Sequence, residues 1–253
     1  MIVTFLGTGT SHGIPVIGCQ CEVCTSLDFR DKRLRASVHI EVDGKSIVID
    51  SGPDFRQQML LAHIKRLDAL LFTHEHKDHI AGLDDIRAFN FWQSKPIPVF
   101  ANRRVINKIE KEYDYIFTEK KYPGIPEIEI HEITNTTFTA DGITVLPIEV
   151  MHYKLPVFGF RIKDFTYITD AKTITDKELE KVKGSKVVVV NALQKAEHIS
   201  HMNLTEAIDL LEKLKPEKGY LIHMSHKMGL TRDVSRELPP FINFAYDGLK
   251  IHL

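Results

Sequence analysis

Residues 73–79, with the sequence THEHKDH, place three histidines and an aspartate within six positions. His74 and His76 are two residues apart and point the same way in extended backbone, whereas Asp78 and His79 can face a second point. Imidazole and carboxylate groups are ligands for zinc, manganese and iron. Two such ions about 3.5–4 Å apart can activate a water that attacks an ester. A solvated polar loop is the alternative, but it gives no reason for so many ligand types together, and the motif predicts a two-metal centre.

Two coordination spheres need more donors than this motif supplies. His152 follows the apolar run ITVLPIEVM, Asp170 follows FTYIT and His223 follows YLI, so each lies where a predicted strand ends. The two oxygens of the Asp170 carboxylate could contact two ions at once. Each of these residues alone could equally be a structural polar group. Their shared position at strand ends is what favours the metal centre.

A second cluster contains all the cysteines of the chain, Cys19, Cys21 and Cys24. Three thiolates need a fourth donor to form a closed tetrahedral zinc site, and we choose His226, three residues after His223. Buried or redox-reactive thiols are the alternative, and the lack of a fourth cysteine disfavours an iron–sulfur centre. The cluster therefore predicts one structural zinc that braces a loop and leaves no open position for catalysis.

The pattern of apolar residues predicts the elements that must position these groups. Short runs rich in Val, Ile and Phe indicate strands, and apolar residues at helical spacing indicate helices. The predicted strands are 2–6, 37–42, 46–50, 68–73, 98–101, 127–133, 143–151, 159–162, 166–169, 187–190 and 220–223, and the predicted helices are 54–63, one from His79 onward, and 204–214. We expect an α/β fold in which two sheets pack face to face with helices outside, a four-layer αββα sandwich. Periodicity alone suits a plain α+β domain equally well.

Composition limits the classes of protein to consider. The 253 residues are 43% hydrophobic and 26% charged, which excludes a disordered chain, and a net charge of −1 provides no general attraction to nucleic acid or an anionic membrane. No apolar run approaches the roughly 20 residues of a membrane helix, and no leader precedes the first strand, so we expect a cytoplasmic protein with no membrane partner. No linker divides the sequence, so residues 1–253 are expected to form a single domain. A homodimer is left open.

The HxHxDH motif followed by a His, an Asp and a His resembles the metallo-β-lactamase superfamily, whose members share the αββα sandwich and a metal site at the edge of the two sheets. The resemblance implies a supporting role beside the metals for Asp50, in the run VIDSG. It also implies two ligand sets that share one aspartate: His74, His76, His152 and Asp170 for one ion, and Asp78, His79, Asp170 and His223 for the other.

Several runs resemble one family within this superfamily, the phosphoribosyl cyclic phosphodiesterases of the carbon–phosphorus lyase pathway, which open a five-membered cyclic phosphate on ribose. These runs are GIPVIGC, LFTHEHKDHIAGL, ITD, LIHMSH and FAYDGL. The resemblance implies that His201, in SHMNL before a helix, either binds phosphate or protonates the leaving oxygen. With Asp78 it forms the predicted catalytic pair. The simpler alternative for His201 is a surface histidine at a helix start.

Together these features predict a metal-dependent phosphodiester hydrolase with a binuclear centre of zinc or manganese, or iron, and one structural zinc. Its expected substrate is a small cyclic ribose phosphate or a similar phosphodiester. A ribonuclease Z-like nuclease acting on transfer RNA is the alternative, since that family also begins with a run like LGTG at 6–9. The chain has no long basic, glycine-rich arm, which makes nucleic acid an unlikely partner. A non-catalytic metal-binding or sensor protein on the same scaffold is the alternative from another class.

Overall fold

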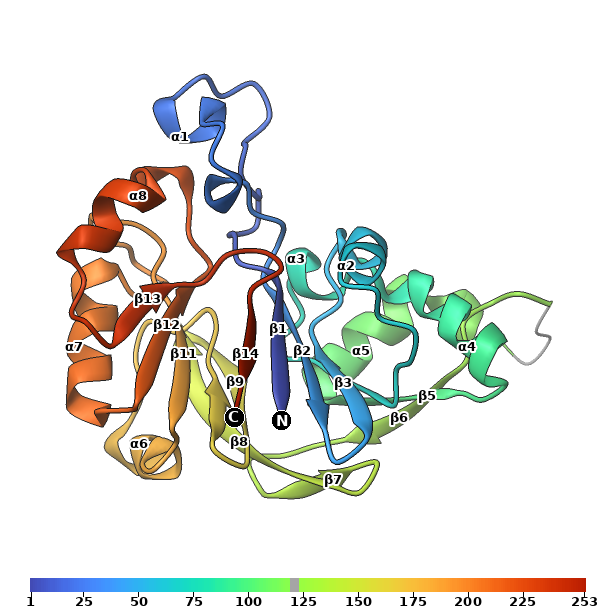
Figure 1. Cartoon of the computed structure of the whole chain (residues 1–253). Coiled ribbons are helices and arrows are strands. Elements are labelled where there is room, and N and C mark those ends of the chain that lie inside the picture. The colour runs from blue at the N-terminus through green and yellow to red at the C-terminus, as the bar shows by residue number, and fades with distance from the viewer. Residues whose placement is uncertain (119–122) are drawn as a thin grey trace.

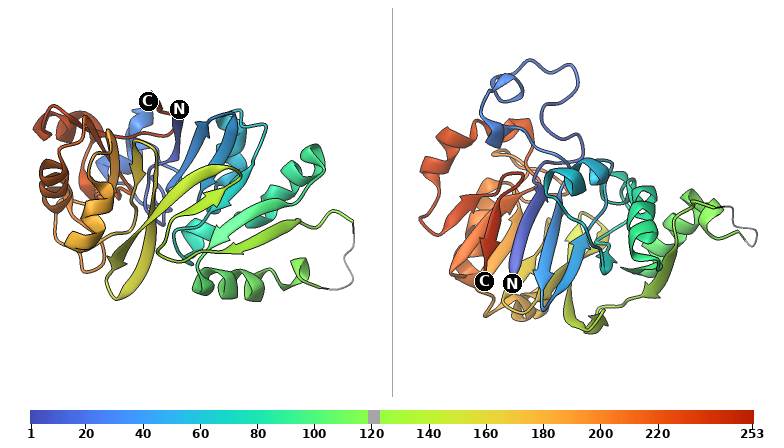
Figure 2. Two further views of the ribbon diagram at one scale, coloured as in Figure 1. Left: turned by 90° about the horizontal axis from the view of Figure 1, so that it is seen from below. Right: turned by 45° about the vertical axis from the view of Figure 1, so that its right-hand side comes forward.

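Two mixed seven-stranded sheets face each other in the computed structural model, which describes residues 1–118 and 123–253 (Figures 1 and 2). The first sheet has the order β14-β1-β2-β3-β4-β5-β6, and the second has the order β13-β12-β11-β10-β9-β8-β7. The first sheet contains β1 (Ile2–Gly7), β2 (Ser37–Val42), β3 (Lys45–Ile49), β4 (Ala69–Leu71), β5 (Ile97–Ala101), β6 (Ile128–Glu132) and β14 (Lys250–His252). The second contains β7 (Phe138–Ala140), β8 (Ile143–His152), β9 (Leu155–Ile162), β10 (Phe165–Tyr167), β11 (Val187–Asn191), β12 (Lys218–Ile222) and β13 (Ile242–Phe244).

The main core lies between the sheets. Alternate residues of each strand point inward, so Phe5 and Ile40 of the first sheet meet Phe160 and Tyr167 of the second, all fully buried. Each sheet has a second apolar face, and these outer faces need a cover of their own. Both halves of the sequence therefore contribute to one continuous inter-sheet core.

Helices provide that cover and complete the predicted four-layer αββα sandwich. Apolar residues of α2, α4 and α5 pack on the outer face of the first sheet, and those of α6, α7 and α8 pack on the second. The helices are α1 (Glu22–Thr25), α2 (Phe55–Leu61), α3 (Lys77–Ile80), α4 (Arg87–Gln93), α5 (Arg103–Glu112), α6 (Asp176–Val182), α7 (Leu204–Leu214) and α8 (Thr231–Val234). Within the described ranges, none of them is long and apolar enough to cross a bilayer.

Strand direction determines where the chemistry collects. β3 and β4 are parallel, as are β10, β11 and β12, and β8 runs in the direction of β10 because β9 is antiparallel to both. The segments that follow these strands contain the predicted ligands. The chain therefore delivers its polar residues to one edge of the sandwich.

The structure corrects several predicted boundaries. The helix expected from His79 begins at Lys77, and the strand expected from residue 159 begins at Leu155 because it forms a hairpin in which His152 pairs with Leu155. The short strands β7, β13 and β14 and the helices α1, α4, α5, α6 and α8 were not predicted. Each of these three strands has three residues, too few to show a period.

A buried histidine of the first sheet makes folding sensitive to acid. His39 is 2% exposed, and its Nε2–H donates to Ser46 Oγ over 2.8 Å. Burial lowers the pKa of His39 to about 4, and nearby Lys250 lowers it further. The folded chain therefore keeps this ring neutral where an unfolded chain would protonate it.

We expect the free energy of unfolding to fall as the pH drops from about 6.5 to about 4, because the unfolded state binds the additional proton in that window. The difference between a pKa of 6.5 and one of about 4 corresponds to about 3 kcal/mol. His39→Gln should flatten this part of the pH–stability curve measured by urea unfolding. His252→Gln, at an exposed position of β14, is the control and should leave the curve unchanged. A wild-type slope in the His39→Gln variant would contradict the assignment.

Candidate metal centres

Three of the predicted site residues lie at most three positions after the end of a strand and have left-handed backbone. Asp50 after β3 has φ of +65°, Asp170 after β10 has +58° and His223 after β12 has +57°. Aspartate and histidine tolerate this conformation better than most residues, yet it still costs free energy. The turn it produces brings each side chain to the common sheet edge.

The first predicted ligand set gathers at this edge. His74 Nε2 lies 3.0 Å from His76 Nδ1, and the His152 ring lies 5.2 Å from that of His76. Two ring nitrogens bound tetrahedrally to one zinc ion would be roughly 3.3 Å apart. An Asp170 oxygen lies 3.8 Å from His74 Nε2. His74, His76 and Asp170 each offer a donor atom within 4.8 Å of the other two, whereas His152 forms such a group with Asp170 and His201.

Asp170 also faces the second set. Its other oxygen lies 3.5 Å from His79 Nε2 and 3.3 Å from His223 Nε2, and Asp78 Oδ2 lies 3.2 Å from His79 Nε2. The structure thus brings together all seven residues predicted for the two-metal centre. One buried carboxylate stands between two groups of imidazoles, with one oxygen toward each.

Hydrogen bonds fix how the histidines present their nitrogens. Asp50 accepts from His79 Nδ1 over 2.7 Å and from the Thr73 hydroxyl over 2.8 Å. Since that hydroxyl donates to Asp50, it accepts from His74 Nδ1, and His152 Nδ1 donates to the Ser200 carbonyl. In their neutral forms, His74, His79 and His152 therefore carry the ring proton on Nδ1 and present a bare Nε2 to the centre, the arrangement that metal-binding histidines require.

The buried atoms and charges of this site fit cations. Within the described part of the chain, His79 Nε2 and both ring nitrogens of His223 are buried without a hydrogen-bond partner. Burial alone would raise the pKa of Asp170, but the charges of His223 and His79 hold it well below its usual range. Burial likewise opposes protonation of His79, yet Asp78, Asp170 and Asp50 raise its pKa well above 6.5. The ionised carboxylates thus draw positive charge to atoms that have no other partner.

His201 lies against the same donors. Its ring is 4.5 Å from that of His152 and 4.9 Å from that of His223, and its Nδ1 is buried without a partner in the described residues. Burial lowers the pKa of His201 to about 3. The ring is therefore neutral and can donate one N–H.

His198 also lies beside this site, although it was not among the predicted site residues. Its ring lies 5.3 Å from that of His201, and its Nδ1 accepts from the backbone N–H of Ser200, the residue whose carbonyl binds His152. These contacts lie within an irregular loop, for which apolar periodicity gives no signal. His198 extends the row of imidazoles toward solvent.

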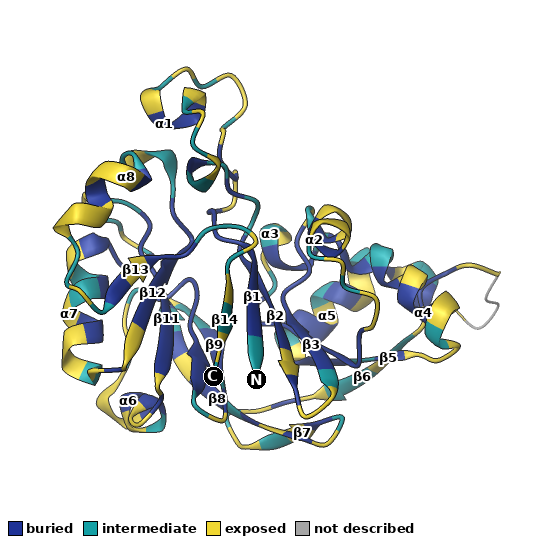
Figure 3. Cartoon of the chain, in the orientation of Figure 1, coloured by how far each residue is buried: buried dark blue, intermediate teal, exposed yellow. Residues whose placement is uncertain are grey.

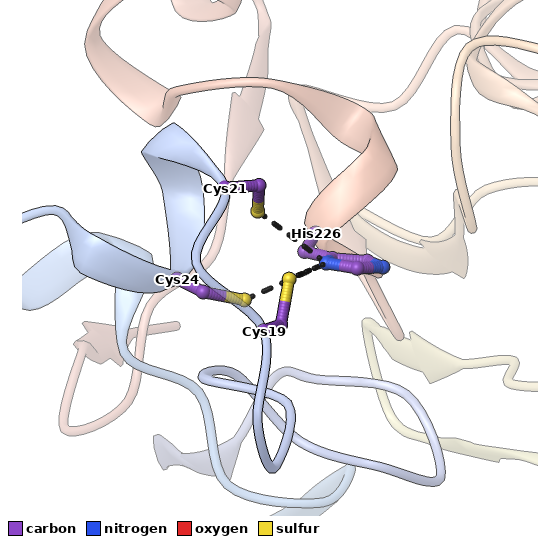
Figure 4. A group of neighbouring side chains, drawn as sticks. All are labelled: Cys19, Cys21, Cys24 and His226. Carbon is purple, nitrogen blue, oxygen red and sulfur yellow. Dashed lines mark hydrogen bonds between the residues drawn. The ribbon is translucent and has the colours of Figure 1, made fainter.

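The cysteine cluster also assembles as predicted (Figure 4). Nδ1 of His226 lies 3.2 Å from Cys19 Sγ, 3.4 Å from Cys21 Sγ and 3.5 Å from Cys24 Sγ. A tetrahedral zinc site would hold sulfur and nitrogen roughly 3.5 Å apart. A hydrogen bond from the Cys24 backbone lowers the pKa of Cys21 to about 6, whereas burial raises the pKa of Cys24 to about 11. The four residues can hold one ion with no open position.

The loop that bears the cysteines projects from the sandwich but is fastened at its base (Figure 1). Thr10 N–H donates to the Met224 carbonyl over 3.0 Å, and Met224 N–H donates to the Thr8 carbonyl. The buried Arg33 donates to the Thr8 hydroxyl over 2.6 Å and to the Ala245 carbonyl over 2.7 Å. The loop therefore joins the segment that contains both His223 and His226.

Comparison with known proteins identifies the family. Residues 45–224 match the model of the family described as the Beta-lactamase superfamily domain. The chain belongs to the β-lactamase superfamily. The matched range contains all seven residues predicted for the two-metal centre, and it ends two residues before His226.

Two comparisons extend over nearly the whole of this β-lactamase superfamily chain. A crystal structure described as a new diphosphatase from the PhnP family superposes with a TM-score of 0.93 at 36% identity, covering 100% of this chain and 97% of that one. The octanoyltransferase of Porphyromonas gingivalis is 41% identical over 97% of this chain, which covers 50% of that protein. A ribonuclease Z of Staphylococcus epidermidis is 29% identical over 64% of this chain and 49% of its own length. The chain therefore spans about half the length of the curated relatives it matches.

The position of Asp170 predicts that Asp170→Asn will lower the metal content at the histidine–aspartate centre by about two ions, because one carboxylate serves both groups. His76→Ala, which removes a donor of one group only, should lower it by about one. The measurement is elemental analysis after dialysis. Asp114→Asn, on the surface, is the control. Retention of both ions by Asp170→Asn would show that this residue does not bridge.

The cysteine cluster predicts a different outcome for Cys21→Ser. This variant should lose one zinc ion and keep the metals of the histidine–aspartate centre, because the two donor sets share no residue. A loss of about 2 kcal/mol would lower the Tm by about 4–8 °C in a scanning calorimeter. Gln20→Ala, on the same loop, should change neither quantity. An unchanged Tm together with full zinc content would rule out the structural site.

Proposed function

We propose that this chain is a binuclear metal-dependent phosphodiester hydrolase that acts on a small cyclic ribose phosphate or a similar phosphodiester. The observation that supports this most is the Asp170 carboxylate, with one oxygen toward His74 and the other toward His79 and His223. A single-ion site would not need both oxygens. The position of His201 beside this carboxylate adds a group that can contact a phosphate.

Divalent cations held by the two donor sets would neutralise the phosphate charge and lower the pKa of water at the site. Zinc and manganese suit these ligands, as does iron, and zinc suits the three cysteines with His226. Asp78 is partly open to solvent, with a side chain 11% exposed. Its carboxylate orients the attacking water in addition to holding an ion.

His201 acts as a neutral hydrogen-bond donor to a phosphate oxygen. Of the two roles expected from the resemblance, this one suits a buried ring whose pKa lies at about 3. A proton donor at neutral pH would need a higher pKa. Hydrogen bonds that strengthen as charge develops on phosphate contribute directly to the rate.

A phosphoric anhydride is the second candidate substrate. The PhnP-family structure, similar over the whole chain, is described as a diphosphatase. A diphosphate and a cyclic phosphodiester both present an electrophilic phosphorus centre with anionic oxygens to the same two donor sets. The octanoyltransferase name is not transferred, because half of that relative lies outside the match.

The test is turnover by metal-loaded protein of four substrates: a cyclic ribose phosphate, bis-p-nitrophenyl phosphate, a nucleoside diphosphate and a precursor transfer RNA. We expect hydrolysis of the first two. Preference for the diphosphate would favour the second candidate. Cleavage of the RNA alone would favour the ribonuclease alternative, and no turnover of any substrate would favour a metal-binding protein without catalysis.

His201→Ala should lower kcat for the preferred substrate by about 10²–10³ without changing the metal content, because it removes one donor to phosphate. His12→Ala, at an exposed position, is the matched control. An unchanged kcat in His201→Ala would remove His201 from the catalytic residues.

A further inference from the structure

An exposed apolar surface lies on the helices that cover the first sheet. Leu60 and Leu61 at the end of α2 are 58% and 65% exposed, and Phe91 and Trp92 on α4 are 75% and 78% exposed. We call these four residues the α2–α4 patch. Figure 3 colours parts of both helices as exposed. Single exposed apolar residues are common, but a group of this size usually marks a contact surface.

A hollow of about 1280 Å³ includes most of the patch. Leu60, Phe91 and Trp92 line it together with the apolar residues Met59, Ile64, Phe89 and Ile125. The Phe91 and Trp92 side chains pack edge to face, with ring centroids 5.1 Å apart. Exposed aromatic side chains and an apolar hollow thus belong to the same face.

That juxtaposition favours a second copy of the chain as the occupant. In a two-fold dimer the same surface of both copies meets, so it must complement itself. The exposed aromatic pair and the apolar lining of the hollow supply such a surface, because apolar side chains of one copy can cover those of the other.

The charges around the hollow also favour a second copy of the chain as the occupant. Two cations, Arg56 and Lys65, and two carboxylates, Asp85 and Glu127, line it and form no ion pair within the described ranges. Two other lining cations are already paired, Arg87 with Asp84 and Lys95 with Asp68. The unpaired charges balance, so two copies would not repel each other. An anionic membrane, RNA or acidic peptide would instead select a rim with excess positive charge.

We propose that the α2–α4 patch and the hollow form the interface of a two-fold symmetric homodimer. A stable interface buries roughly 800 Å² on each partner. Two aromatic side chains of about 150–250 Å² each and two leucines supply a large part of that area as an apolar centre. The surrounding charges form the polar rim that interfaces normally have.

Trp92 makes the proposal directly measurable, because it is the only tryptophan of the chain. In the dimer its ring leaves water, so the fluorescence emission of the full-length, metal-loaded protein should shift to longer wavelength on dilution. Sedimentation velocity should show the dimer dissociating over the same concentrations. A monomer at all concentrations, with solvent-exposed Trp92 emission throughout, would overturn the proposal.

Trp92→Glu should raise the dimer dissociation constant at least about 30-fold, since a central tryptophan is a typical energetic centre of an interface. Phe91→Glu should also weaken the dimer and retains Trp92 as the probe. Ile17→Glu, a fully exposed apolar position on the cysteine loop, is the control and should not change the dissociation constant. Circular dichroism and zinc content establish that each variant is folded. A dimer that survives both α4 substitutions, or that Ile17→Glu dissociates equally well, would place the interface elsewhere.

Discussion

A carboxylate buried among imidazoles is the constraint on which this structure depends. Asp170 is 2% exposed and reaches four histidines, His74, His79, His201 and His223, none farther than 3.9 Å from one of its oxygens. An ionised carboxylate in such a place needs compensating positive charge. The surrounding ring nitrogens are oriented so that they can bind a cation that supplies this positive charge. The strand-end turns and the Asp50 hydrogen bonds all serve to hold them in that orientation.

Much of this centre was predictable because its donors follow strands. A strand that ends in a ligand leaves a signal in the sequence, an apolar run followed by His or Asp, and this signal located His152, Asp170 and His223. The left-handed backbone that aims two of these residues had no such signal. His198 was missed because its contacts are made within a loop, and no local pattern indicates which side chains of a loop meet.

The fold was predictable to a similar depth. The sandwich follows from apolar runs in both halves, but β7, β13 and β14 are too short to be recognised alone and exist because a neighbouring strand pairs with them. Helix α5 did have signals, an Asn102 cap and apolar residues at 105, 106 and 109. The close packing of two segments could not be predicted from the sequence. A Cβ atom on Gly52 would lie 2.0 Å from the Asp78 carbonyl oxygen. Only a glycine lets the turn after β3 pack against α3.

Four consecutive residues, 223–226, contribute a histidine to each donor cluster. Cys19 and His226 are 207 positions apart, so an ion caught between them closes most of the polypeptide into a ring. The chain entropy lost on closing that ring is then no longer an additional cost when His223 approaches the remaining donors. The cysteine cluster would consequently act as a long-range crosslink of the fold, while the histidine–aspartate centre keeps its own complete set of donors.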